Sequence, residues 1–370
     1  MRAYLFVMVV AASVTYLTTP LVRRIARRIG AITPVRDRDV HTVPIPRMGG
    51  VAMLCGFAVS MVMAWQLHFL QPVFQGPNGS PWGVLLGATA VCALGVADDL
   101  WQLDAVTKLA GQAIAAGLMA WKGVQFVAVP LAGLTLLSPG GLVVLSILAV
   151  IVTINAVNFV DGLDGLAAGI VAIAGSAFFV YSYQIARRAS AHDDSYASLA
   201  TLITAGLVGC CLGFLPHNFN PARIFMGDSG SMLIGLLLAA PTIALTGQVD
   251  PTVVSGLKIA PAFFPIVLPL AVLALPFIDL LLAVIRRTRA GQAPWHPDKS
   301  HLHHRMLRLG HSHAHAVLIM YMWTATVAFG VALTAFDLTK ALAVAGASML
   351  VALILTFGPL TRGVLGRHAH

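Results

Sequence analysis

The chain has 370 residues, of which 58% are hydrophobic and only 10% charged, and its mean hydropathy is +0.86. Because a soluble domain carries about 25% charged residues, this composition excludes an ordinary soluble protein and indicates a chain surrounded mostly by lipid. The net charge of +9 does not predict a nucleic-acid partner, since Lys and Arg occur in short loops between apolar segments. We expect a single membrane-embedded domain over residues 1–370 and no nucleic-acid binding.

Apolar segments recur from end to end, and the bilayer core takes about 20 residues of helix to cross. The predicted fold is all-α, a polytopic integral membrane protein with about eleven transmembrane helices. The predicted segments are Tyr4–Val22, Gly50–Phe69, Pro81–Ala97, Lys108–Trp121, Gly141–Val157, Leu163–Tyr183, Leu199–Phe214, Gly230–Leu245, Ala262–Ile285, Ala316–Phe336 and Ala341–Leu360. Lys108–Trp121 is short, and the β-branched, Gly- and Pro-broken segment Val124–Leu137 after it favours an external hairpin.

The charges around these segments predict their orientation. Basic residues follow the first segment rather than precede it, which is typical of an uncleaved helix and not of a signal peptide. Alternating the segments from there places most of the 23 Lys and Arg residues on one side, which the positive-inside rule makes cytoplasmic. We therefore expect the N-terminus outside and the C-terminus in the cytoplasm.

All fourteen acidic residues are Asp, and six of them fall at predicted cytoplasmic ends: Asp98, Asp99, Asp104, Asp161, Asp164 and Asp228. The adjacent carboxylates of Asp98 and Asp99 repel each other unless a cation neutralises them. The alternative is that they cap the next helix, for which one Asp would be enough.

Two further motifs combine carboxylates with amides. Asp161 and Asp164 are three residues apart, so a helical turn would place both in one row with Asn158. Asp228 immediately precedes an apolar helix, where it is either an N-cap or a metal ligand beside backbone N–H groups that suit phosphate.

A fourth motif is rich in histidine and contains His301, His303, His304 and Arg305. Zinc would prefer fixed nitrogen and sulfur ligands, and no cysteine is near, so a phosphate-binding loop is the better interpretation. Mg²⁺ takes one or two carboxylates and completes its shell with water and substrate phosphates. Carboxylates and basic groups in separate loops of one membrane face thus indicate phosphoryl transfer on a diphosphate substrate.

At these loops the sequence resembles the polyprenyl-phosphate N-acetylhexosamine-1-phosphate transferases, which form glycosyltransferase family 4. The matching segments are ADDLWQLDAVTK (97–108), NAVNFVDGLDGLAAG (155–169), NPARIFMGDSGS (220–231) and HPDKSHLHHRML (296–307), with PRMGG (46–50) as a weaker fifth. The resemblance implies cytoplasmic active-site loops at 97–108, 155–169, 216–231 and 286–315.

The reaction that the resemblance implies is attack of a polyprenyl phosphate on the β-phosphate of a UDP-sugar, with release of UMP. Asp98, as base or orienting group for the lipid phosphate, would form the catalytic group with Asp99, Asp161 and His301. Asp228 and Asn158 would hold Mg²⁺, with Mn²⁺ as a substitute. The implied substrate-binding residues are Lys108, Asn155, Asp164, Asn218, Phe225, His303, His304 and Arg305.

The last loop decides between two branches of this family. The branch acting on UDP-MurNAc-pentapeptide typically has three consecutive histidines followed by Phe-Glu, whereas DKSHLHHRML resembles the branch that accepts UDP-N-acetylglucosamine. We expect the second branch, an undecaprenyl or decaprenyl phosphate acceptor and a bacterial cytoplasmic membrane. The phospho-MurNAc-pentapeptide transferase and, outside enzymes, an ion-coupled transporter are the alternatives, and a homodimer is one option for the assembly.

Overall fold

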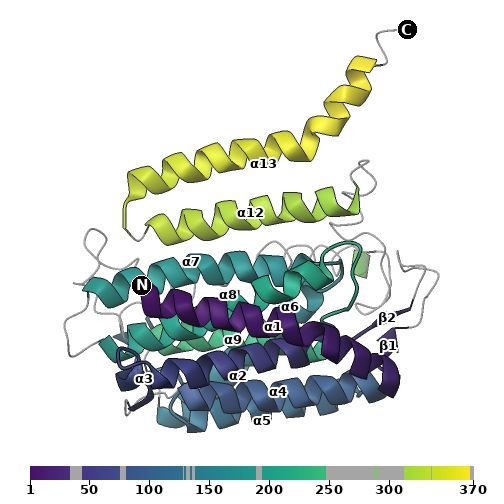
Figure 1. Cartoon of the computed structure of the whole chain (residues 1–370). Coiled ribbons are helices and arrows are strands. Elements are labelled where there is room, and N and C mark those ends of the chain that lie inside the picture. The colour runs from purple at the N-terminus through teal and green to yellow at the C-terminus, as the bar shows by residue number, and fades with distance from the viewer. Residues whose placement is uncertain are drawn as a thin grey trace.

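The structure is a computed structural model that describes residues 1–33, 44–75, 81–127, 129–130, 134–135, 138–188, 194–246, 288–289, 312–334 and 336–366. Its long elements are helices (Figure 1). The helices are α1 (Arg2–Ile29), α2 (Gly49–Gln66), α3 (Gln71–Gln75), α4 (Pro81–Trp101), α5 (Ala105–Trp121), α6 (Pro139–Val160), α7 (Leu166–Arg188), α8 (Asp194–Asn218), α9 (Gly227–Leu245), α12 (His313–Thr334) and α13 (Leu338–Gly366). Two antiparallel pairs of short strands join them, β1 (Ile32–Thr33) with β2 (Ile45–Pro46) and β3 (Val129–Pro130) with β4 (Leu134–Thr135).

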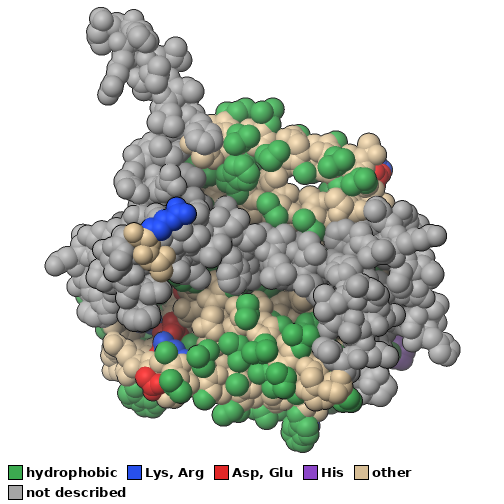
Figure 2. Space-filling view, turned by 180° about the vertical axis from the view of Figure 1, so that it is seen from behind, with side chains coloured by type: hydrophobic (Ala, Val, Ile, Leu, Met, Phe, Trp, Pro, Cys, Tyr) green, Lys and Arg blue, Asp and Glu red, His purple; other side chains and the backbone are tan. Residues whose placement is uncertain are grey.

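Within the described residues, nine helices are long and apolar enough to cross a membrane: α1, α2, α4, α6, α7, α8, α9, α12 and α13. They confirm a helical, polytopic membrane protein, and each coincides with one predicted segment. The short predicted segment Lys108–Trp121 is α5, which has only 17 residues, and Ala262–Ile285 lies outside the described residues. The β3–β4 pair confirms the predicted hairpin, and uncharged side chains cover most of the described surface in Figure 2.

Helix α9 forms the centre of the bundle. Every residue from Ser229 to Leu245 is buried, and α2, α4, α6 and α8 pack around it. The periphery is different: α12 packs on α7, and α13 packs on α12 at the outer edge (Figure 1). Residues of α13 such as Leu350 and Ile354 are 60% and 61% exposed, as expected of a surface that faces lipid.

Two glycines let neighbouring helices touch the first turn of α9. A Cβ on Gly50 of α2 would lie 2.2 Å from the backbone nitrogen of Gly230, and a Cβ on Gly95 of α4 would lie 2.4 Å from Cα of Ser229. Small residues at such crossings allow the close backbone approach on which helix packing in membranes depends. The first turn of α9 is therefore held between α2 and α4.

We expect Gly95→Ala to destabilise the protein by about 1–3 kcal/mol, because its methyl group would overlap the backbone of α9. Gly346→Ala in α13 is the matched control, since a Cβ there meets nothing within 4 Å. The measurement is the melting temperature of both variants in the same detergent. Equal melting temperatures for the two variants would contradict the close approach.

Candidate active site

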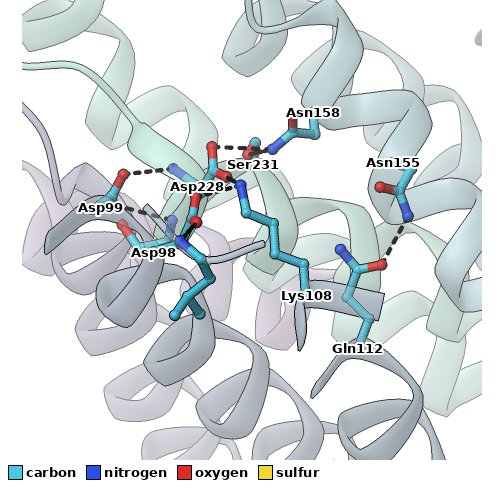
Figure 3. Close-up of polar contacts among 10 residues, drawn as sticks. Asp98, Asp99, Lys108, Gln112, Asn155, Asn158, Asp228 and Ser231 are labelled. Carbon is cyan, nitrogen blue, oxygen red and sulfur yellow. Dashed lines mark hydrogen bonds and ion pairs between the residues drawn. The ribbon is translucent and has the colours of Figure 1, made fainter. Parts of the chain in front are cut away.

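A lysine bridges two carboxylates at the end of the bundle where α4, α5 and α9 meet. The Nζ atom of Lys108 lies 2.6 Å from Oδ2 of Asp98 and 3.0 Å from Oδ2 of Asp228 (Figure 3). Asp98 is 6% exposed, and its other oxygen accepts a hydrogen bond from the backbone N–H of Leu103 at 2.8 Å. The structure thus brings together three predicted residues, and the ammonium group supplies the cation that the converging carboxylates require.

The neighbouring carboxylate of Asp99 points to the backbone at the start of α9. It accepts hydrogen bonds from the backbone N–H groups of Asp228 at 2.9 Å and Ser229 at 3.2 Å, so it caps the first turn of α9 from another helix. The alternative for Asp98 and Asp99 was that they cap the following helix, α5. The residue that caps α5 is instead Asp104, which accepts from the N–H groups of Val106 and Thr107.

Asp228 does not cap its own helix, so that alternative for it is wrong. The N-cap position of α9 is occupied by Met226, which makes no capping hydrogen bond through its side chain. Because Asp99 already accepts from the N–H groups of Asp228 and Ser229, the carboxylate of Asp228 is available to Lys108 and, at 3.2 Å, to the amide of Asn158. The position of Asp228 thus fits a ligand-binding role better than a cap.

A row of amides on α5 and α6 continues from this ionic cluster. Asn158 also donates to Oγ of Ser231 at 3.0 Å, and one turn earlier Asn155 donates to Oε1 of Gln112 at 2.8 Å (Figure 3). Gln112 is 1% exposed and lies one turn after Lys108 on the same face of α5. The sequence analysis missed Gln112 and Ser231, although an amide within an apolar segment was a usable signal.

The predicted helical row of Asn158, Asp161 and Asp164 is wrong. Helix α6 ends at Val160, and residues 161–165 form a turn that closes with Gly165 at φ +77°, a conformation that favours glycine. The turn directs the buried carboxylate of Asp164 away from Asn158, to the amide of Asn220 and the N–H of Ala222, each at 3.0 Å.

The other predicted residues near this turn contact the chain itself. Asn218 accepts from the N–H of Gly165 at 3.1 Å and donates to the carbonyl of Ile224 at 3.0 Å. The N–H of Phe225 donates to the carbonyl of Pro46, which places the PRMGG segment beside the start of α9. The contacts of Asn218 and Asp164 shape the loop between α8 and α9, and their contact with a substrate stays a prediction. His301, His303, His304 and Arg305 lie outside the described residues.

The donor set fits a hard cation such as Mg²⁺. Among the described residues, no three His, Cys, Asp or Glu side chains gather closely enough to hold a metal by themselves. Two carboxylates with amide and hydroxyl groups beside them are nevertheless the oxygen donors that Mg²⁺ uses when phosphates and water complete its shell. Asn158 could present its oxygen by rotating its amide.

Comparisons with known proteins agree with the motifs. The model of glycosyl transferase family 4 matches residues 81–246, which span α4 to α9. The decaprenyl-phosphate N-acetylglucosaminephosphotransferase of Mycolicibacterium smegmatis is 43% identical over 98% of this chain and 90% of its own length. The protein of the same name from Mycobacterium tuberculosis is 42% identical over 96% and 90%. The probable undecaprenyl-phosphate N-acetylglucosaminyl 1-phosphate transferase of Bacillus subtilis is 32% identical over 85% and 81%.

The chain belongs to glycosyl transferase family 4. This confirms the resemblance drawn from the motifs. The residues matched by the family 4 model include Asp98, Lys108, Asn158 and Asp228, so the ionic cluster lies within the part of the chain that defines the family.

In this family 4 site, the carboxyl group of Asp161 has a raised pKa. Desolvation, together with the negative charges of Asp228 and Asp99, raises the pKa of Asp161 to about 7. Asp161 lies in the turn after α6, and Arg47 is the basic residue that opposes this effect. A proton or a cation is therefore favoured beside Asp161 at neutral pH.

In metal-free buffer, we expect wild-type stability to fall relative to Asp161→Asn as the pH rises from about 4 to about 7. The reason is that the folded state keeps a proton on Asp161 up to a pKa of about 7, whereas the unfolded chain releases it near the ordinary value of 3.8. Above this range both states are ionised and the difference levels off. Melting temperatures across the pH series measure the effect, with Asp104→Asn as the control. A constant difference between wild type and Asp161→Asn would contradict it.

Proposed function

We propose that this chain transfers N-acetylglucosamine-1-phosphate from UDP-N-acetylglucosamine to a polyprenyl phosphate, releasing UMP. In this reaction a phosphate oxygen of the lipid forms a bond to the β-phosphorus of the nucleotide sugar, and the bond from that phosphorus to the oxygen of UMP breaks. The product is a polyprenyl-diphosphate sugar. The relatives' names support the polyprenyl phosphate acceptor and the transferred N-acetylglucosamine phosphate, because these relatives align with nearly the whole chain at up to 43% identity. The nucleotide donor is what membership of the family implies.

The observation that carries this proposal is the bridge of Lys108 between Asp98 and Asp228. It provides acidic and basic groups within one hydrogen-bonded cluster, as phosphoryl transfer requires. Asp98 orients the lipid phosphate or accepts its proton, while Lys108 interacts with phosphate oxygens. Such a cluster has no use in a membrane anchor, and it lies at helix ends rather than at the midplane, where transporters bind their ions.

We propose Mg²⁺ as the cofactor, with Mn²⁺ as a substitute. Asp228 would hold it together with Asn158, whose amide already lies 3.2 Å from that carboxylate. When bound, the ion neutralises charge on the diphosphate and on the departing UMP. Asp161 adds a further carboxyl group to the region, and its raised pKa is consistent with a site that attracts positive charge.

We also propose the membrane arrangement predicted from the charges. The chain crosses a bacterial cytoplasmic membrane about eleven times, with the N-terminus outside and the C-terminus and active site in the cytoplasm. Nine apolar helices among the described residues support a multi-pass protein. Arg23, Arg27 and Arg28 at the end of α1 support the orientation, since basic residues favour the cytoplasmic side. A homodimer stays a prediction.

The test of function is UMP release by the purified protein in detergent with polyprenyl phosphate and Mg²⁺. We expect release with UDP-N-acetylglucosamine that depends on the lipid, and a loss of about 100-fold or more in Asp98→Asn and Asp228→Asn. Asp337→Asn is the control, because Asp337 pairs only locally with Lys340 near the start of α13. Release with UDP-MurNAc-pentapeptide alone would replace the substrate by that of the alternative branch. Normal turnover in both active-site variants would contradict the mechanism.

We expect Lys108→Met to bind Mg²⁺ more tightly than wild type in the absence of substrate, by about three- to tenfold. The ammonium group must leave the two carboxylates before a metal can reach them, so its removal eliminates a competitor. Calorimetric titration with Mg²⁺ measures this without turnover. Lys122→Met is the control, since Lys122 lies over the ring of Trp121 at the other end of α5. An unchanged or weaker affinity in Lys108→Met would contradict the competition.

A further inference from the structure

Helix α12 contacts the predicted active site through one tyrosine. The hydroxyl of Tyr321 donates a hydrogen bond to the carbonyl oxygen of Gly165, the residue that closes the turn after α6. Tyr321 is partly buried against the core, although α12 belongs to the outlying pair of helices and, among the described helices, packs mainly on α7 and α13 (Figure 1). This contact therefore reaches from the periphery of the bundle to the loop that carries Asp161 and Asp164.

The surface of α7 is shaped to receive this ring. A Cβ on Gly169 would lie 2.0 Å from Cζ and 2.1 Å from the hydroxyl oxygen of Tyr321, so no larger residue fits there while the ring keeps its place. A Cβ on Gly165 would lie 3.4 Å from the same hydroxyl. The ring thus lies directly over the first turn of α7, at the distance that only glycine permits.

Gly165 is held from two directions. Its N–H donates to the side-chain oxygen of Asn218 at the end of α8, and its carbonyl accepts from Tyr321 of α12. The same carbonyl also accepts the N–H of Gly169 at 3.0 Å as α7 begins. Because glycine has no Cβ, many backbone conformations are open to Gly165, and the one it adopts has φ at +77°. The two side chains hold one of them, in the turn that also carries Asp161 and Asp164.

We infer that Tyr321 is a positioning residue for the turn at residues 161–165, which carries the predicted site residues Asp161 and Asp164. This inference rests on the proposed function. Tyr321 is about 12 Å along α12 from its first residue, His313. The predicted histidine-containing loop ends where α12 starts, so the helix that Tyr321 docks on α7 is also the one that continues from that loop.

The test compares Tyr321→Phe with Trp323→Phe in the full-length protein. The first removes only the hydroxyl. The second removes the indole donor of the same helix, which bonds Oγ1 of Thr356 in α13 at 3.2 Å, away from the site. We expect Tyr321→Phe to raise KM for UDP-N-acetylglucosamine about tenfold, in line with a lost hydrogen bond, with little change in KM for the lipid or in melting temperature. Trp323→Phe should leave both KM values unchanged.

Hydrogen exchange supplies a second measurement that does not depend on turnover. Amides of residues 161–169 should exchange faster in Tyr321→Phe than in wild type, and at the wild-type rate in Trp323→Phe. Unchanged exchange in Tyr321→Phe, or the same acceleration in both variants, would overturn the inference. If the wild type proved inactive with UDP-N-acetylglucosamine, the proposed function would fall, while the exchange rates would still decide whether Tyr321 positions this turn.

Discussion

The arrangement of the site depends on the cap that Asp99 of α4 places on α9. Helix α9 is buried from Ser229 onward and half-buried at Gly227 and Asp228, so N–H groups of its first turn are largely shielded from water and would be costly if left unpaired. Asp99 accepts two of them, and the glycines of α2 and α4 bring both helices against the same turn. The cap fixes the position of Asp228 along the bundle axis relative to Asp98, because Asp98 and Asp99 are consecutive residues of α4.

The ionic cluster and the amides beyond it form a graded polar layer. Lys108 neutralises the two carboxylates where the helices begin or end, and one turn deeper Gln112 pairs with Asn155 as a neutral amide bridge. In this group of described residues, charge lies at the end of the bundle, and the groups that extend further into apolar surroundings are neutral amides. This order follows from insertion costs, since an ion at the centre of a membrane helix is far more costly than a paired amide.

Hydropathy was sufficient to predict nine described spans, and β-branched residues broken by Gly and Pro predicted the hairpin, because each depends on the residues of one segment. The motifs also singled out Asp98, Lys108 and Asp228, which the structure brings into one cluster. Which residues contact each other within the site was harder to predict from the sequence. Asp99 caps a helix 129 residues further along the chain, which no local pattern reveals. The row expected for Asp161 and Asp164 failed because helix α6 ends at Val160, one residue before Asp161, and a turn that closes with Gly165 at positive φ follows.

Asp98 and Asp99 are adjacent in one motif but have different roles. Consecutive residues of a helix point about 100° apart, so Asp98 and Asp99 face different neighbours despite being adjacent. Asp98 pairs with the flexible cationic side chain of Lys108. Asp99 instead accepts from backbone N–H groups that can move only together with α9. Loss of either carboxylate would impair the site, but by different routes: Asp98 acts on what binds there, and Asp99 acts on the position of Asp228. A measurement of activity alone would therefore not distinguish the two, whereas a change in the stability of α9 belongs to Asp99.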